Sequence, residues 1–157
     1  MIQVTLKNGT VKEYEKNTPV AEVAKSLGGG LFKAVCACKI DGSVCDLRTE
    51  LTKDCTLELL TFEDDEGKKA FWHTASHVLA QAVKKLYPSA RIAIGPAVDN
   101  GFYYDFDVEK PFTQEDLESI EAEMKSIIKS GLTLERFTLA PDAAIRLLQE
   151  MEEPYKV

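Results

Sequence analysis

The residues best suited to chemistry are the chain's only two histidines, His73 and His77. They are four positions apart, and residues at i and i+4 of an α-helix lie one above the other, so both imidazoles would share one face. Two imidazoles placed in this way can bind a metal ion or share the activation of a water molecule. The pair is also compatible with two incidental residues, because no glutamate follows His73 to complete the zinc-protease helix motif.

The helix that carries the histidines is expected to turn them away from its own apolar side. At about 100° per residue, the two histidines fall beside Ala80 and Lys84. The opposite side holds the apolar residues Phe71, Val78, Leu79, Ala82, Val83 and Leu86. The imidazoles are therefore predicted to face solvent or a second, polar cavity. No firm metal site is predicted, because Cys55 is the last cysteine and no third ligand follows the histidines.

A second candidate is the segment 94–105, which is rich in glycine and aromatic residues. Gly95 allows a close backbone approach or a tight turn. In a strand, Phe102 and Tyr104 would face one way and Tyr103 the other. One face could line a cleft, or the whole segment could be a core hairpin with tyrosine hydroxyls at its rim.

Lys156 is the third candidate, although nothing in the local sequence distinguishes it. It lies near the end of the chain, between Tyr155 and Val157. A lysine in such a place is usually a solvated surface residue. Only a resemblance to a known family gives it a role.

The four cysteines, at positions 36, 38, 45 and 55, contain no C-x-x-C pair. Cys36 and Cys38 would point to the same face of a strand. The expected role of all four is that of small hydrophobic residues. A zinc knuckle or a disulfide pair remains the alternative.

The bulk composition indicates an ordinary globular protein. The chain has 157 residues, 45% hydrophobic and 29% charged, which permits one medium domain or two small ones. No apolar run reaches the roughly 18 residues of a membrane span, and the start lacks the features of a signal peptide, so a cytoplasmic location is expected. A net charge of −7 argues against a free-standing nucleic-acid binder.

The first part of the chain is expected to be a ubiquitin-like β-grasp domain, residues 1–62. Asn8-Gly9 predicts a hairpin with a type I′ turn, and Asp41-Gly42 a second turn. Thr18-Pro19 predicts an N-cap and first helical position, and Gly28-Gly29-Gly30 a helix stop. The predicted order is ββαβββ, with strands at 2–6, 11–14, 34–40, 44–47 and 56–60 and a helix at 19–27.

The second part, residues 63–157, is expected to be a separate α+β domain. The charged stretch 63–69 is a plausible junction. Thr113 with Asp116 resembles a capping box. It precedes an amphipathic stripe of Leu117, Ile120, Met124, Ile127 and Ile128. Helices are predicted at 68–86 and 141–151 and strands at 91–97, 102–106 and 134–139.

Two resemblances cover essentially the whole chain. Thr18-Pro19, Ala34-Val35 and Asp41-Gly42 resemble a TGS domain, a module shared with GTPases and stringent-response enzymes. The later motifs resemble the editing domain of bacterial threonyl-tRNA synthetases, in order and spacing. They are His73-Thr74-Ala75-Ser76-His77, Ala93-Ile94-Gly95-Pro96, Asp99 to Asp105 and Tyr155-Lys156-Val157.

This resemblance implies a site that removes serine wrongly attached to threonine tRNA. His73 and His77 would lie in that site, Lys156 would reach it, and Tyr104, Gly95 and Asp99 would bind substrate. The family's Cys-x-x-x-His pair lies downstream, so the second domain is expected to be an incomplete editing domain. The aminoacylation and anticodon-binding domains would be missing as well.

The resemblance also implies partners and cofactors. The expected partners are the acceptor end of tRNA(Thr) and the remainder of the synthetase, with homodimerisation through the absent domains and no membrane contact. No cofactor is expected in this chain, whereas the full enzyme would use ATP, Mg²⁺ and a zinc ion held elsewhere. Metal binding by His73 and His77 stays open. The alternatives are a free-standing trans-editing hydrolase and a TGS-type regulatory binding module.

Overall fold

The computed structural model describes residues 1–157, which divide into two compact units, Met1–Phe71 and Trp72–Val157. The division falls within the helix α3, Asp65–Leu86. The domain boundary predicted after residue 62 stays a prediction. No helix is long and apolar enough to cross a membrane.

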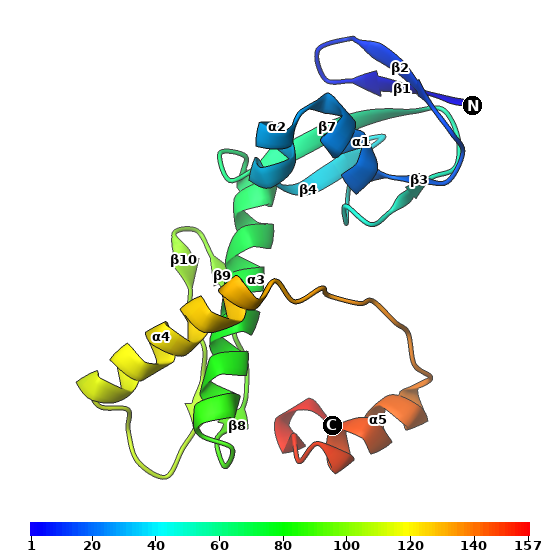
Figure 1. Cartoon of the computed structure of the whole chain (residues 1–157). Coiled ribbons are helices and arrows are strands. Elements are labelled where there is room, and N and C mark those ends of the chain that lie inside the picture. The colour runs from blue at the N-terminus through cyan, green and yellow to red at the C-terminus, as the bar shows by residue number, and fades with distance from the viewer. The chain divides into compact units, whose positions relative to one another are not determined.

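The first unit is built on a five-stranded sheet with the order β2-β1-β7-β4-β5 (Figure 1). Its strands are β1 (Ile2–Leu6), β2 (Val11–Tyr14), β4 (Val35–Ile40), β5 (Ser43–Cys45) and β7 (Cys55–Thr61). β1 and β7 are parallel, and the other pairs are antiparallel. A mixed sheet around one main helix confirms the predicted β-grasp.

The core of the first unit lies between this sheet and α1 (Val20–Leu27). Val4 from β1 and Leu57 from β7 are buried with Val20 and Val23 of the helix. Alternate strand residues and helix residues three apart each share a face, and so both sets point inward. This packing is what the apolar pattern predicted.

One local prediction in the first unit was wrong, the start of its helix. Thr18 and Pro19 form a short strand, β3, which pairs with β6 (Glu50–Leu51), so α1 begins only at Val20. The pairing with β6 holds Pro19 extended, with ψ 144°. The predicted helix stop at Gly28-Gly29-Gly30 is confirmed, because α1 ends at Leu27 with Gly28 as its C-cap, and a second helix, α2, then runs over Gly29–Ala34.

The two hairpin turns differ in their backbone. Asp41 and Gly42 both have positive φ, 49° and 82°. In the first hairpin only Gly9 does, at 83°, and its N–H donates to Leu6 O at 2.8 Å. The hairpin prediction is therefore confirmed, but the turn at Asn8-Gly9 is not type I′.

The second unit combines helices with two small two-stranded sheets. β8 (Arg91–Ile92) pairs with β11 (Phe106–Asp107), and β9 (Ala97–Val98) pairs with β10 (Gly101–Phe102). The two strands predicted at 91–97 and 102–106 are each interrupted. The interruption on the first side covers residues 93–96 and ends at Pro96, which has no N–H to donate to a ladder.

Helices α4 and α5 follow the sequence pattern closely. α4 (Gln114–Ser130) has the predicted capping box between Thr113 and Asp116, and its Ile120 is buried in the unit's core. α5 (Pro141–Glu150) is followed by a short 3₁₀ turn, η1 (Pro154–Lys156). The core also contains Ala82 and Val83 of α3.

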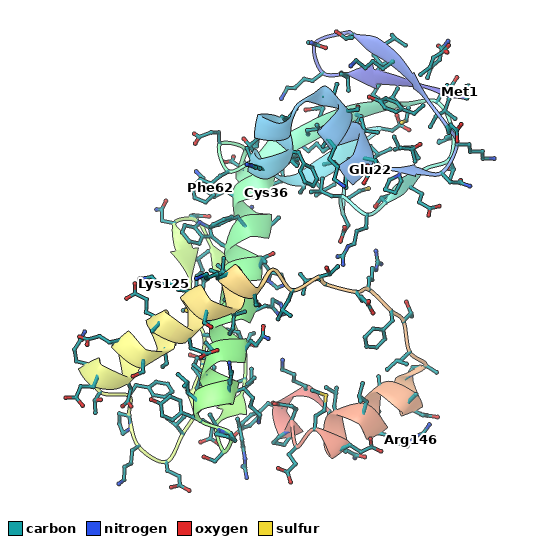
Figure 2. All side chains as sticks on the ribbon, viewed as in Figure 1. Met1, Glu22, Cys36, Phe62, Lys125 and Arg146 are labelled. Atoms are coloured by element: carbon teal, nitrogen blue, oxygen red, sulfur yellow. The ribbon has the colours of Figure 1, made fainter.

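The predicted strand at 134–139 is absent from the structure. Residues 132–140 have no regular structure, and every side chain in 131–140 is exposed (Figure 2). The segment joins none of the sheets. The apolar residues Leu134, Phe137 and Leu139 therefore do not make a strand without a partner ladder.

All four cysteines are free thiols. Cys38 and Cys55 are buried, whereas Cys36, labelled on β4 in Figure 2, is partly exposed. Burial raises the pKa of Cys38 to about 12. Its thiol donates to Cys45 O at 3.3 Å, so it behaves as a small core residue with a satisfied donor.

Candidate functional site

The two histidines stand together on α3. Their Nε2 atoms are 3.1 Å apart, and their ring centroids are 4.6 Å apart with an interplanar angle of 75°. At this separation one ring donates its N–H and the other accepts it on a free nitrogen lone pair. The two imidazoles are therefore joined by a hydrogen bond through one ring proton.

The local fold exposes both imidazoles while it buries the residue between them. Ser76 is fully buried, and its hydroxyl donates to His73 O at 2.7 Å. His73 and His77 both remain exposed. The sequence predicted that both imidazoles point away from the apolar side of their helix, and their exposure agrees with that prediction.

The rest of the helical-wheel prediction needs a correction. Ala80, expected on the polar side with the histidines, is only 6% exposed. Phe71 and Leu86, expected on the apolar side, are 46% and 38% exposed. Ala80 lines a cavity of about 480 Å³ together with Leu148 and Met151 from the C-terminal part of the chain, which covers that side of α3.

The electrostatic surroundings favour a neutral His77. Burial lowers the pKa of His77, and the neighbouring His73 and the positive charge of Lys156 lower it further. A neutral imidazole near pH 7 can accept a proton from a water or hydroxyl group. Lys156 also lines one cavity together with Ala80 and Lys84, which follow His77 by about one and two turns of α3.

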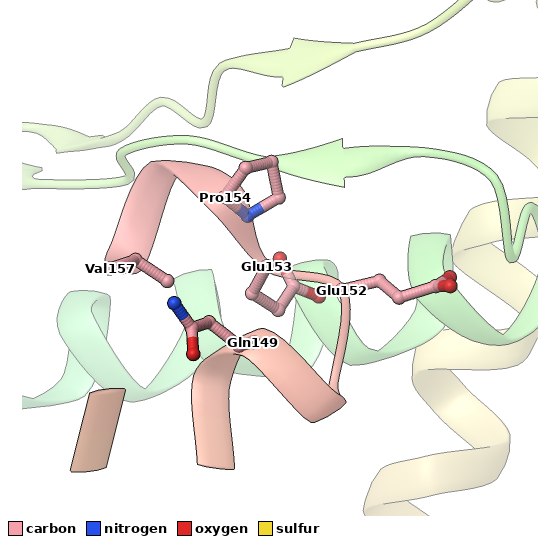
Figure 3. Close-up of a pocket in the computed structure, with 5 residues that line it drawn as sticks. All are labelled: Gln149, Glu152, Glu153, Pro154 and Val157. Atoms are coloured by element: carbon pink, nitrogen blue, oxygen red, sulfur yellow. The ribbon is translucent and has the colours of Figure 1, made fainter. Parts of the chain in front are cut away.

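Lys156 reaches this place because the turn that carries it is fixed at two points. The Glu153 carboxylate lies 3.1 Å from Lys84 Nζ of α3. The Tyr155 hydroxyl donates to Asp107 Oδ2 at 2.9 Å. Figure 3 shows Glu153 and Pro154 on this turn, beside Gln149 and Val157.

Gly95 and Tyr104 form a second group. A Cβ at residue 95 would lie 2.7 Å from Tyr104 Cγ and closer still to the ring edge, so only glycine leaves room for this ring. Tyr104 also stacks on Phe106, with centroids 4.8 Å apart. Burial raises the pKa of Tyr104, and the nearby carboxylate of Glu153 adds to the effect.

The six predicted site residues thus fall into three places. His73 and His77 are in contact on α3, with Lys156 in a cavity that Ala80 and Lys84 of the same helix also line, and Gly95 packs against Tyr104. Asp99 lies in the exposed turn that follows β9, and no hydrogen bond or ion pair joins it to the histidines. No group of three or more His, Cys, Asp or Glu side chains is arranged to hold a metal ion.

Sequence reasoning missed two residues that shape this region, Glu153 and Lys84. One signal was available for Lys84, which lies seven residues after His77 and so on the same helix face. Glu153 is three residues before Lys156, but only the folded chain shows that it is buried.

Comparison with known proteins supports the resemblance seen in the sequence. Residues 2–61 match the TGS domain. The whole chain is 57% identical to a threonine–tRNA ligase of Acetivibrio thermocellus and 53% identical to one of Clostridium acetobutylicum, over 157 residues in each case. A ligase of Caldanaerobacter subterraneus subsp. tengcongensis is 53% identical over 98% of the chain. The chain spans about a quarter of the length of these relatives, 25%, 25% and 24%.

Proposed function

We propose that this chain contributes to the hydrolysis of seryl-tRNA(Thr). Its residues 2–61 are a TGS domain, and the whole chain is similar to the N-terminal quarter of bacterial threonine–tRNA ligases. The observation that carries the proposal is the convergence of three groups, a proton-sharing histidine pair and the lysine beside it. The threonine and the tRNA come from the relatives, which are threonine–tRNA ligases.

A ligase for threonine has a chemical need for such a hydrolysis. Serine lacks one methyl group of threonine, and one methyl group in a binding pocket is worth only about 1–3 kcal/mol, or roughly 10–200-fold. A second site that accepts the seryl ester and excludes the bulkier threonyl ester by size supplies the remaining discrimination.

The reaction is the hydrolysis of an aminoacyl ester. It needs a water held near the carbonyl, a group that takes its proton, and positive charge for the oxyanion. His73 would orient the water or relay the proton, helped by the shared Nε2 contact with His77. His77 would hold substrate groups, and the Lys156 ammonium would stabilise the developing negative charge.

The remaining parts of the longer relatives would supply the rest of the function. The net charge of −7 makes this chain a poor general binder of tRNA, so other segments would hold most of it. This chain would meet the acceptor end alone. ATP, Mg²⁺ and zinc, together with dimerisation, would likewise belong to segments outside this chain.

The test measures deacylation of seryl-tRNA(Thr), with threonyl-tRNA(Thr) as the substrate that should resist. The enzyme is the Acetivibrio ligase with its matching quarter replaced by this chain, assayed beside the 157-residue chain. His73→Ala and Lys156→Ala should each lower the rate by about 10²–10⁴-fold. Lys110→Met, at an exposed lysine of the same unit, should leave it unchanged.

Wild-type rates in both His73→Ala and Lys156→Ala would refute the assignment. Specific tRNA or protein binding that survives these substitutions, without hydrolysis in any variant, would instead favour a TGS-type binding module. Full activity of the 157-residue chain alone would favour a free-standing trans-editing hydrolase.

A further inference from the structure

Glu153 is an unusual residue for its position near the end of the chain. It is only 4% exposed, and Ser76 is the one other buried polar residue. A buried carboxylate costs free energy unless a partner compensates for its lost hydration. Its partner is Lys84, whose Nζ lies 3.1 Å from Glu153 Oε1.

Lys84 is itself held in place. Its ammonium also donates to Ala90 O at 3.1 Å, which fixes the side chain between α3 and the start of β8. Lys84 lies seven residues after His77, about two helical turns along the same face. Glu153 is therefore anchored to the same face of the helix that carries the histidines.

The backbone connects this anchor directly to Lys156. The Glu153 N–H donates to Leu148 O at 3.0 Å, which ties it to the last turn of α5. Its carbonyl accepts from the Lys156 N–H at 3.1 Å, which closes the turn η1. Between α5 and η1 the chain reverses at Glu152, whose φ of 56° is positive.

The geometry points to Glu153 as the positioning residue for Lys156: its ion pair with Lys84 holds the 3₁₀ turn against α3 and thereby keeps the Lys156 ammonium beside the histidine pair. This inference rests on the proposed function for its relevance to hydrolysis. The hydrogen bond from Tyr155 to Asp107 supports the same turn from β11.

The second carboxylate oxygen of Glu153 argues that the residue does more than fill space. Oε2 is buried and has no hydrogen-bond partner. A glutamine would fit the same volume but could not form the ion pair with Lys84. The charge, and not the shape alone, is therefore what a test must remove.

The experiment follows the imidazole signals of His77 by NMR as a function of pH, in the 157-residue chain labelled with ¹⁵N-histidine. Only two histidines exist, so the spectrum contains two pairs of ring signals. Lys156→Met should raise the pKa of His77, because it removes a positive neighbour. Glu153→Gln should raise it in the same direction, and the double variant should add nothing to Lys156→Met alone.

Three further variants keep the test decisive. Lys84→Met breaks the same ion pair from the other end and should repeat the Glu153→Gln shift. The charge swap Lys84→Glu with Glu153→Lys should return the titration toward wild type. Glu152→Gln, which removes an exposed carboxylate next in sequence, should leave it unchanged.

A His77 titration that stays at its wild-type midpoint in folded Glu153→Gln and Lys84→Met, while Lys156→Met moves it, would overturn the inference. If the variants shift the titration but the ligase still deacylates seryl-tRNA at the wild-type rate, the positioning role stands and the proposed hydrolysis fails. When both the positioning role and the proposed hydrolysis hold, Glu153→Gln and Lys84→Met should lower the rate of seryl-tRNA deacylation, and the charge swap should restore that rate.

Discussion

The substitution Gly67→Ala separates helix propensity from tertiary packing. Gly67 lies inside α3, in the first unit. Helix propensity alone predicts that the free energy of unfolding rises by about 1 kcal/mol, because alanine loses less backbone entropy than glycine when the helix forms. The structure predicts the opposite sign.

The magnitude follows from what an added Cβ would meet. It would lie 2.8 Å from the carbonyl carbon of Thr61 and closer still to the carbonyl oxygen, where ordinary contacts begin at 3.4 Å. The obstacle is backbone, and the same oxygen accepts from the Asp64 N–H at 3.1 Å. We therefore assign the upper range of overpacking costs, about 3 kcal/mol, which leaves a net loss of about 2 kcal/mol.

A loss of this size is measurable in two ways. Thermal unfolding of a unit this small should shift downward by roughly 8–16 °C. Hydrogen exchange of amides in β1 and β7 should accelerate by roughly 30-fold if they exchange through global opening of the unit. Peptides from these strands report on the first unit alone.

Gly30→Ala is the matched control. Gly30 is also a helical glycine of the first unit, but a Cβ there would meet nothing within 4 Å. That variant should be stabilised by about 0.5–1 kcal/mol. If Gly67→Ala leaves the stability of the first unit unchanged, or raises it as Gly30→Ala does, the packing argument is refuted.

Two predictions concern the second unit, and both are read from urea unfolding followed by Trp72, the only tryptophan. Gly95→Ala should cost about 1–3 kcal/mol, because its Cβ would lie 2.7 Å from Tyr104 Cγ, but it should be nearly neutral in a Tyr104→Ala background. Tyr87→Phe should destabilise the unit at pH 7, and its difference from wild type should shrink as the pH falls below about 4. The Tyr87 hydroxyl donates to Asp116 at 2.6 Å, and this bond, followed by those from Thr113, holds the pKa of Asp116 below its ordinary value. A lowered folded-state pKa stabilises the protein above the unfolded pKa, and that stability is lost as the pH falls through the folded pKa.

A specific result would contradict each of these two predictions. An equal cost of Gly95→Ala with and without the Tyr104 ring would show that the ring is not the obstacle. For the pH prediction, Tyr103→Phe at an exposed tyrosine serves as the control and should change little. A Tyr87→Phe penalty that stays constant from pH 7 to acid would mean that Asp116 does not carry it.

The sequence predicted those features that depend on near neighbours along the chain. Apolar residues at strand and helix periods gave β1, α1 and α4, because each of these elements buries one face in a core. The capping box at Thr113 and the turn at Asp41-Gly42 were predicted from the residues themselves, since their hydrogen bonds and dihedral angles are local. The shared face of His73 and His77 is local in the same sense.

The tertiary structure decided everything that depends on which distant segment arrives at a face. Thr18 and Pro19 became a strand because β6 lies beside them, and the apolar tract at 134–139 did not because no ladder meets it. Ala80 is buried by the C-terminal part of the chain, although its helix position alone marks it as polar-facing. Lys156 is distant from the histidines in sequence, and the turn that carries it is held in the second unit by the Glu153–Lys84 ion pair and the Tyr155–Asp107 hydrogen bond. Periodicity fixes which residues share a face, whereas the burial and charge of that face depend on contacts between remote segments, which no local pattern encodes.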